Sequence, residues 1–202
     1  MTRKLFGLAL AAASALFIAP GSASAAALVA SAGNCANQSL AQAFLPWADV
    51  ADYTLDPGGD FESGSDWSLS GGAAVVSGNE PFNVGSATDS SSLSLPAGAS
   101  ATSDPICVGI GHPDVRLFAK SSNAGGALRA EVLFEDAYGN LLSAPIGVVS
   151  AGGFWAPTAP LPIVANLLPL LPNAMTPVEF RFTASGGSFQ IDDVYVDPYR
   201  SA

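Results

Sequence analysis

Carboxylates and a single histidine are the groups of this sequence that could carry out hydrolytic chemistry. Glycoside hydrolysis uses two carboxylates about 5 to 9.5 Å apart. Glu131 and Glu135 fall on one face of a predicted strand, where four residues span about 13 Å, so this pair suits a ligand-contacting or solvated face better than hydrolysis. His112 lies in the turn Gly111–Asp114, and no nucleophile or orienting group can be assigned to it by spacing. The sequence therefore predicts a non-catalytic protein, and a hydrolase or lyase is the alternative.

The N-terminus has the order of features found in a secretory signal peptide. Arg3 and Lys4 precede the apolar run Leu5–Ala19, and small residues follow at Ala23-Ser24-Ala25. The apolar run has about 15 residues, fewer than the roughly 20 that a membrane-spanning helix needs. We expect residues 1–25 to be a signal peptide cleaved after Ala25, the mature chain to be secreted, and no transmembrane segment to remain.

The mature chain is strongly acidic. Its formal charge of −10 becomes −12 when Arg3 and Lys4 leave with the signal peptide, because that segment contains no acidic residue. Nucleic-acid binding needs a dense basic surface. We expect no nucleic-acid partner, since the remaining basic residues are few and dispersed: Arg116, Lys120, Arg129, Arg181 and Arg200.

Cys35 and Cys107 are predicted to form a disulfide, because a cysteine pair in an exported protein meets an oxidising destination. The bond would close a loop of about 70 residues, for which the chain-entropy estimate is roughly 4 kcal/mol of stabilisation. It would also tie an N-terminal extension, residues 26–51, to the rest of the chain. Within that extension, residues 34–48 form the one plausible short helix, with an apolar cluster of Leu40, Phe44, Leu45 and Trp47.

From Asp52 onward the pattern changes to short β-type runs separated by turn-forming residues. Apolar residues at 178, 180 and 182 alternate with polar residues at 179, 181 and 183, as in a strand with one buried face. The fold class predicted is all-β: a two-sheet antiparallel β-sandwich over residues 52–198. Its strands are expected at 67–69, 73–77, 91–95, 106–110, 115–119, 128–135, 146–150, 178–183 and 189–196.

Residues 157–177 are apolar but contain six prolines, which rule out a long continuous helix. We interpret this segment as an edge strand, a helical turn at 165–168 and a loop into the next strand. An exposed apolar surface that binds a partner is the alternative.

Two motifs at the ends of the predicted domain are recognisable. The first is Gly58-Gly59-Asp60-Phe61-Glu62, followed by Trp67 and the small residues Gly71-Gly72-Ala73, and the second is the run FQIDDVYV at 189–196. In this order they resemble the opening and the last strand of galactose-binding-like jelly-roll modules of the carbohydrate-binding type. About 145 residues lie between Asp52 and Asp197, close to the usual size of such a module. The resemblance implies a jelly roll whose first and last strands are neighbours, often with a structural calcium ion between them.

Asp60, Glu62, Asp192 and Asp193 would supply carboxylates for such an ion, because calcium takes six to eight oxygen ligands. Neighbouring residues of a strand point to opposite faces, so Asp192 and Asp193 cannot both reach one site without a β-bulge. One of the two is therefore the better candidate ligand. The alternative is an exposed pair of solvated aspartates.

Sugar-binding relatives place the face of an aromatic ring against the apolar face of a pyranose. The candidate rings here are Trp67, Trp155, Tyr53 and Tyr138, and the candidate hydroxyl partners are Asn79, Glu80, Arg129 and His112. Both tryptophans occur in strand-like contexts, where a core position is also common.

These patterns together predict a secreted, non-catalytic module that binds carbohydrate or a cell-envelope glycan. A structural or partner-binding envelope protein is the alternative, and an exposed apolar patch within 157–177 would support it.

Overall fold

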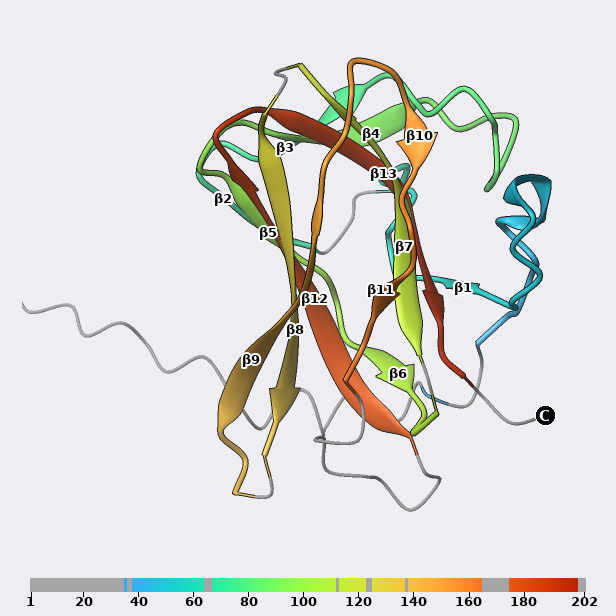
Figure 1. The fold of residues 1–202 in the computed structure, drawn as a ribbon, viewed down its shortest axis with the longest axis vertical. Helices are drawn as coiled ribbons and strands as arrows, with labels where there is room; N and C mark the ends of the chain where they lie inside the picture. Colours follow the sequence, from blue (N-terminus) through green and yellow to red (C-terminus); the bar gives the residue numbers. More distant parts are fainter. Residues whose placement is uncertain are drawn as a thin grey trace, which may run out of the picture.

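Two antiparallel sheets pack face to face in the computed structural model of the chain (Figure 1). The structure describes residues 35, 38–63, 67–111, 113–122, 125–136, 138–164 and 175–199. The alternation predicted for residues 178–183 is confirmed, because Val178, Phe180 and Phe182 are completely buried while the residues between them are partly exposed. The fold is a two-sheet antiparallel β-sandwich, as the sequence predicted.

The first sheet contains the strands β1 (Thr54–Leu55), β3 (Ala74–Ser77), β4 (Ser91–Leu95), β7 (Asp114–Ser121), β10 (Ala156–Pro157), β11 (Leu161–Pro162) and β13 (Phe189–Asp197). Its order is β10-β7-β13-β4-β3, and β11 also pairs with β7. β1 pairs with β13 at Tyr195 and Val196, whereas β4 pairs with β13 from Phe189 to Ile191. The first and last strands of the sandwich are therefore neighbours, as the resemblance implied.

The second sheet contains the strands β2 (Ser68–Ser70), β5 (Ser100–Thr102), β6 (Ile106–Val108), β8 (Ala127–Glu135), β9 (Leu141–Val149) and β12 (Thr176–Ser185). Its order is β2-β5-β12-β8-β9, with β6 beside the first residues of β12. Each strand predicted from the sequence is present, β4 with the predicted ends and the others with shifted ends. The strands that were not predicted, β1 and β5, have two and three residues, too few for an alternation to be visible.

The main core lies between the two sheets, and Trp67 belongs to it. Its ring stacks on Phe182 with the ring centroids 6.1 Å apart, and meets Phe61 edge to face at 5.1 Å. The indole nitrogen donates a hydrogen bond to the carbonyl of Pro57 at 2.9 Å. The Trp67 ring is 4 % exposed, so neither of its faces can stack on a sugar.

The helix predicted over residues 34–48 is wrong for the part that the structure describes, where one short 3-10 turn is found, η2 (Leu45–Trp47). Ala48 adopts a left-handed conformation, with a φ of 62°, and ends this turn. Ala41 instead forms an antiparallel bridge with Tyr53. The extension forms no longer helix here, because its apolar residue Phe44 packs against Phe118 and Tyr195 on the outer face of the first sheet as well as against Trp47.

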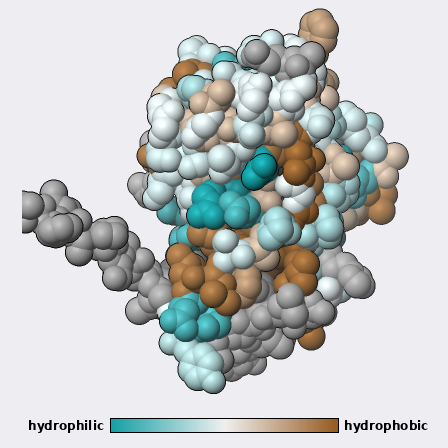
Figure 2. All heavy atoms as spheres, turned by 60° about the vertical axis from the view of Figure 1, so that its left-hand side comes forward, coloured by the Kyte–Doolittle hydropathy of each residue, from teal (hydrophilic) through white to brown (hydrophobic). Residues whose placement is uncertain are grey.

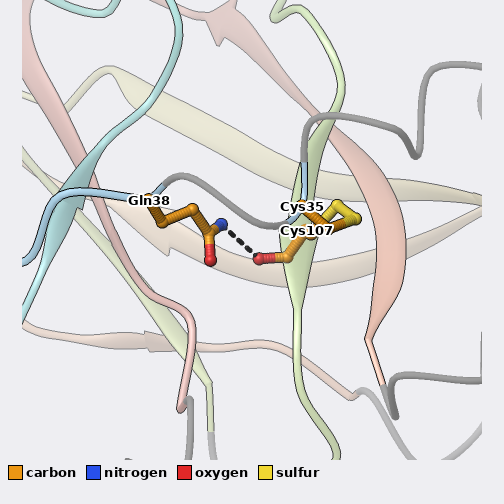
Figure 3. The surroundings of a disulfide bond; sticks show 3 residues. All are labelled: Cys35, Gln38 and Cys107. Carbon is orange, nitrogen blue, oxygen red and sulfur yellow. Dashed lines mark hydrogen bonds between the residues drawn. A yellow bond between two sulfur atoms is a disulfide. The ribbon is translucent and has the colours of Figure 1, made fainter.

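The predicted disulfide between Cys35 and Cys107 is confirmed (Figure 3). The two Cα atoms are 5.2 Å apart, and Cys107 lies in β6. Beside the bond, the side-chain amide of Gln38 donates a hydrogen bond to the carbonyl of Cys107 at 2.7 Å. Met175 belongs to the same buried cluster as Cys35 and Cys107. The extension is thereby tied to the sandwich at its first described residue.

The edge strand predicted within residues 157–177 is confirmed as β10 and β11, which both pair with β7. Leu161 and Ile163 point into the main core, so these apolar residues do not form a partner surface.

The predicted turn at 165–168, the signal peptide and His112 lie outside the described residues. In the part of the chain that the structure describes, no helix has both the length and the apolar character needed to cross a membrane.

Candidate functional site

The outer face of the first sheet has an open half and a covered half. The outward-facing side chains of β7 include Lys120 and Phe118. Lys120 is half-buried and lines a pocket, whereas Phe118 is completely buried beneath the N-terminal extension. The open half is therefore available to a ligand, and the covered half is a second core.

Three polar side chains form a row across the open half. Gln190 of β13 pairs in register with Ser94 of β4 on one side and with Lys120 of β7 on the other. Neighbouring residues of these strands are buried in the main core, so the three side chains point away from it. They line a pocket of about 280 Å³, here called the Lys120 pocket, together with Ser121, Ser122, Gly153, Ser188 and Phe189. Hydroxyl, amide and ammonium groups in this arrangement can exchange hydrogen bonds with a polyhydroxylated ligand.

Trp155 holds the ammonium group of the Lys120 pocket in place. Trp155 directly precedes β10, the strand that pairs with β7 on the side opposite β13. The Lys120 nitrogen lies over the Trp155 ring, 4.6 Å from its centroid, which is a cation–π contact. That ring face is covered by the ammonium and is not open to a sugar. In this structure Trp155 therefore positions a hydrogen-bond donor, a role different from the stacking predicted for it.

The covered half is built around Phe44 of the extension, which is completely buried. Its ring stacks on Phe118 with centroids 5.6 Å apart, and the guanidinium carbon of Arg116 lies 4.2 Å from its centroid. Arg116 is itself held by an ion pair with Asp49. Tyr53, a predicted stacking residue, is 1 % exposed in this cluster, so its ring has no face open to a sugar.

A second pocket, of about 470 Å³, lies where the extension meets the loop after β3. We call it the extension pocket. Trp47 and Phe82 meet edge to face there, with centroids 5.2 Å apart, and Phe82 is 45 % exposed. Its lining also includes Tyr195, Gln42 and Asn83. This pocket is more aromatic than the Lys120 pocket and has no charged side chain in its lining.

A β-bulge in β13 gives the two adjacent aspartates different environments. The register of β13 against β7 shifts between Asp192 and Tyr195, and Asp193 has a φ of 47°. This is the bulge that would bring both carboxylates toward one region. Asp192 accepts hydrogen bonds from the amides of Glu80 at 2.9 Å and of Asp193 at 3.0 Å. Burial, and then the negative charges of Asp193 and Glu80, raise the pKa of Asp192 to about 8 despite these bonds.

Glu80, a predicted hydroxyl partner for sugar, is 1 % exposed and has a structural role instead. Its carboxylate accepts hydrogen bonds from the amides of Phe82 and Val84, so it holds the loop that lines the extension pocket. Asn79 is bound in the same loop, because its side-chain amide donates to the carbonyl of Glu80 at 3.0 Å.

Asp193 is the carboxylate of this region that lacks partners. Both of its oxygens are buried without a hydrogen bond of good geometry, although the backbone amide of Gly85 is close enough to lower the pKa of Asp193 in part. A Cβ atom at Gly85 would lie 3.1 Å from an oxygen of Asp193 and 2.9 Å from an oxygen of Asp89, so both carboxylates approach the same point. Burial is the largest cause that raises the pKa of Asp193 to about 7, and the charges of Glu80, Asp89 and Asp60 also raise it. A cation between Asp193 and Asp89 would relieve this unfavourable environment.

The donors fit calcium, although side chains alone do not complete a site. Among the described residues, no three Asp, Glu, His or Cys side chains converge to hold a metal ion. Backbone carbonyls and water, which calcium accepts, would have to supply the remaining oxygens. Of the other predicted ligands, Glu62 accepts hydrogen bonds from the amides of Ser90 and Ser91, and Asp60 accepts one from the amide of Glu62 at 3.3 Å.

The two remaining candidates for sugar contact lie far from the Lys120 pocket in the fold. Tyr138 is 91 % exposed in the turn between β8 and β9. Arg129 faces outward on β8 of the second sheet, where Arg181 and Glu131 form an ion pair at 2.9 Å. Figure 2 turns the side with β2, β5 and β9 toward the viewer and shows hydrophilic groups between hydrophobic patches. The described sequence candidates are thus spread over both sheets, and among them Trp155 contacts Lys120 of the Lys120 pocket.

Comparisons with known proteins identify relatives of the fold. No protein-family model matches the chain, and no curated protein matches it. Among solved structures, it is similar to the CBM22-1 and GH10 modules of endo-1,4-β-D-xylanase 10B from Clostridium thermocellum complexed with xylohexaose, at 14 % identity and a TM-score of 0.48. This match covers 73 % of the chain and 27 % of the xylanase structure, so the chain spans about a quarter of that protein.

Two similar structures are single modules. The CBM22-1 xylan-binding domain of Paenibacillus barcinonensis is 13 % identical, with 71 % of this chain and 93 % of that one covered and a TM-score of 0.46. The C-terminal CBM6 of a laminarinase from Zobellia galactanivorans is 10 % identical, with 70 % and 95 % covered and a TM-score of 0.45. Most of these structural neighbours contain carbohydrate-binding modules, and another is the enzymatically active domain of tailspike protein 4 of bacteriophage CBA120. A likeness at this level concerns the fold and not the ligand.

Proposed function

We propose that this protein is an exported, non-catalytic module that binds carbohydrate at the Lys120 pocket. The observation that carries the proposal is the row of Ser94, Gln190 and Lys120, which brings hydrogen-bonding groups from three adjacent strands into one pocket. A paired sheet holds such groups at fixed spacing, as recognition of the hydroxyls of a saccharide requires. The jelly-roll motifs at residues 58–62 and 189–196 support the same function, and the N-terminal signal sequence supports export.

The proposal includes a structural calcium ion held by Asp193 and Asp89. The ion would neutralise the unpaired Asp193 carboxylate and fix the loop that carries Glu80 and Gly85. Calcium here supplies positive charge and cross-links the loop to β13. The residues of the Lys120 pocket would bind the saccharide without contact with the ion.

Isothermal titration of the mature protein with oligosaccharides and soluble cell-wall polysaccharides, with calcium present, tests the proposal. Gln190→Ala should lower the affinity for a bound saccharide about three- to tenfold, the worth of one hydrogen bond. Thr183→Ala is the matched control, because it removes a neutral polar side chain from β12, at the centre of the second sheet. It should bind as the wild type does.

The outcomes separate the alternatives. If no saccharide binds, the proposal is refuted. If Thr183→Ala weakens binding and Gln190→Ala does not, the binding face is on the second sheet. Release of new reducing ends from a bound saccharide would show that the protein is an enzyme rather than a binding module.

A further inference from the structure

The Lys120 pocket differs in charge from the rest of this acidic protein. The chain has 17 acidic and seven basic residues, yet the described residues that line the pocket include one lysine and no acidic side chain. Of the other basic residues in the described part, Arg116 is paired with Asp49, Arg181 is paired with Glu131, and Arg129 is exposed on the outer face of the other sheet. The pocket therefore carries a local positive charge within a negative molecule.

The ammonium group of Lys120 is held ready for an anion. Within the described residues it forms no ion pair with a carboxylate, and its contact is with the Trp155 ring, 4.6 Å from the centroid. A cation–π contact restricts the position of an ammonium group but leaves its hydrogen-bond donors free. Its neighbours across the sheet, Gln190 and then Ser94, are neutral. A ligand that lies along this row meets one cation and then uncharged hydrogen-bonding groups.

We propose that the Lys120 pocket selects saccharides that carry a carboxylate, the uronic acids, over their neutral counterparts. This inference rests on the proposed carbohydrate function and names the ligand class for the same pocket. The carboxylate would accept a charge-assisted hydrogen bond from Lys120, while hydroxyl groups of the sugar bind Gln190 and Ser94. The net negative charge of the protein opposes this selection, and physiological salt, with a screening length of about 8 Å, weakens that opposition.

The test compares each uronic-acid oligosaccharide with its own methyl ester, which keeps the sugar ring and removes the charge. Oligomers of galacturonic, glucuronic and mannuronic acid serve as probes in a titration with the mature protein. The free acid should bind about ten- to a hundredfold more tightly than the ester, as expected for a hydrogen bond to a charged group. This preference should fall as salt is raised.

Substitutions assign the preference to Lys120. Lys120→Met should lower the affinity for the acid to that for the ester, and Lys120→Arg should retain the preference because it retains the charge. Arg129→Met is the matched control, since it removes the same charge from the outer face of the other sheet. It should leave the preference unchanged. Thermal melts of all variants report whether each is folded.

Several results would overturn the inference. Equal affinity for acid and ester overturns it while leaving the proposed function intact. The same holds if Arg129→Met removes the preference, or if the preference persists in Lys120→Met. A preference that disappears when calcium is chelated but not in Lys120→Met would assign the carboxylate to a metal-bound position. Failure of every saccharide to bind would refute the proposed function itself.

Discussion

A buried aspartate in the turn after β1 should make the stability of this protein fall as the pH rises. Asp56 is completely buried, and neither oxygen of its side chain has a hydrogen-bond partner of good geometry. Burial raises the pKa of Asp56 well above the usual value, the nearby hydroxyl of Ser103 lowers it in part, and the charges of Asp104 and Glu179 raise it again. The folded protein therefore keeps this carboxyl group protonated at a pH where the unfolded chain has released the proton.

The magnitude follows from proton linkage. The stabilising contribution of the protonated Asp56 is complete below the ordinary carboxyl pKa, near 4, and is lost as the pH rises toward the folded value. Between these limits the free energy of unfolding should fall by about 1.4 kcal/mol per pH unit from this group alone. Asp56→Asn replaces the acid by an uncharged group of the same shape and should remove that part of the slope.

Urea unfolding at a series of pH values between about 4.5 and 6.5 measures the effect, which over two units amounts to about 2.7 kcal/mol. The quantity to plot is the free energy of unfolding of Asp56→Asn minus that of the wild type. This difference should rise with pH, because the wild type loses the contribution of protonated Asp56 and the variant has none to lose. Other buried acids, such as Asp114, whose pKa burial raises to about 6, are present in both proteins and cancel. Asp52→Asn removes the same charge from an exposed position and controls for net charge. A difference that stays constant across this range would show that the folded protein ionises Asp56 freely.

Two further perturbations follow from the same structure. Calcium should raise the melting temperature of the wild type because it binds the folded state. At a hundredfold excess over the dissociation constant, this binding adds about 2.7 kcal/mol to the free energy of unfolding. In a fluorescence melt, Asp193→Asn should remove the shift. A shift that is equally large in Asp193→Asn would place the ion elsewhere. Phe44→Ala should lower the free energy of unfolding by about 3 to 5 kcal/mol, because it empties a fully buried aromatic position between Phe118 and Tyr53. A loss below about 1 kcal/mol in urea unfolding would show that the extension adds little to the fold.

The sandwich could be predicted because the signal for a strand is local. Val178, Phe180 and Phe182 alternate with polar residues within six positions, and burial follows that alternation. The N-terminal extension could not be predicted in this way. Its apolar residues suggested a helix, but Phe44 packs on Phe118 of β7, far along the chain, and this tertiary contact prevailed over local propensity.

The candidate site depends even more on long-range pairing. Gln190 and Lys120 lie on strands that are distant in sequence, and they become neighbours through the register of β13 against β7. Period-two alternation could have placed Gln190 on the outer face, but nothing local pairs it with Lys120. The aspartate pair was only partly accessible to prediction. The alternation of a strand showed that residues 192 and 193 could face one side only through a β-bulge, but the sequence did not show that the bulge is present, as it is in the structure.

The extension also limits the part of the first sheet's outer face that a ligand could reach. Phe44 covers Phe118 of that face, and the Lys120 pocket, of about 280 Å³, lies on the part left open. Since pockets for drug-sized ligands begin at roughly 300 Å³, the proposed saccharide would place only a short piece of its chain in this pocket. Each module would then contact few sugars and bind them weakly. Tight attachment to a polysaccharide would require several copies of the protein on one polymer, since linked sites gain affinity by their high effective concentration.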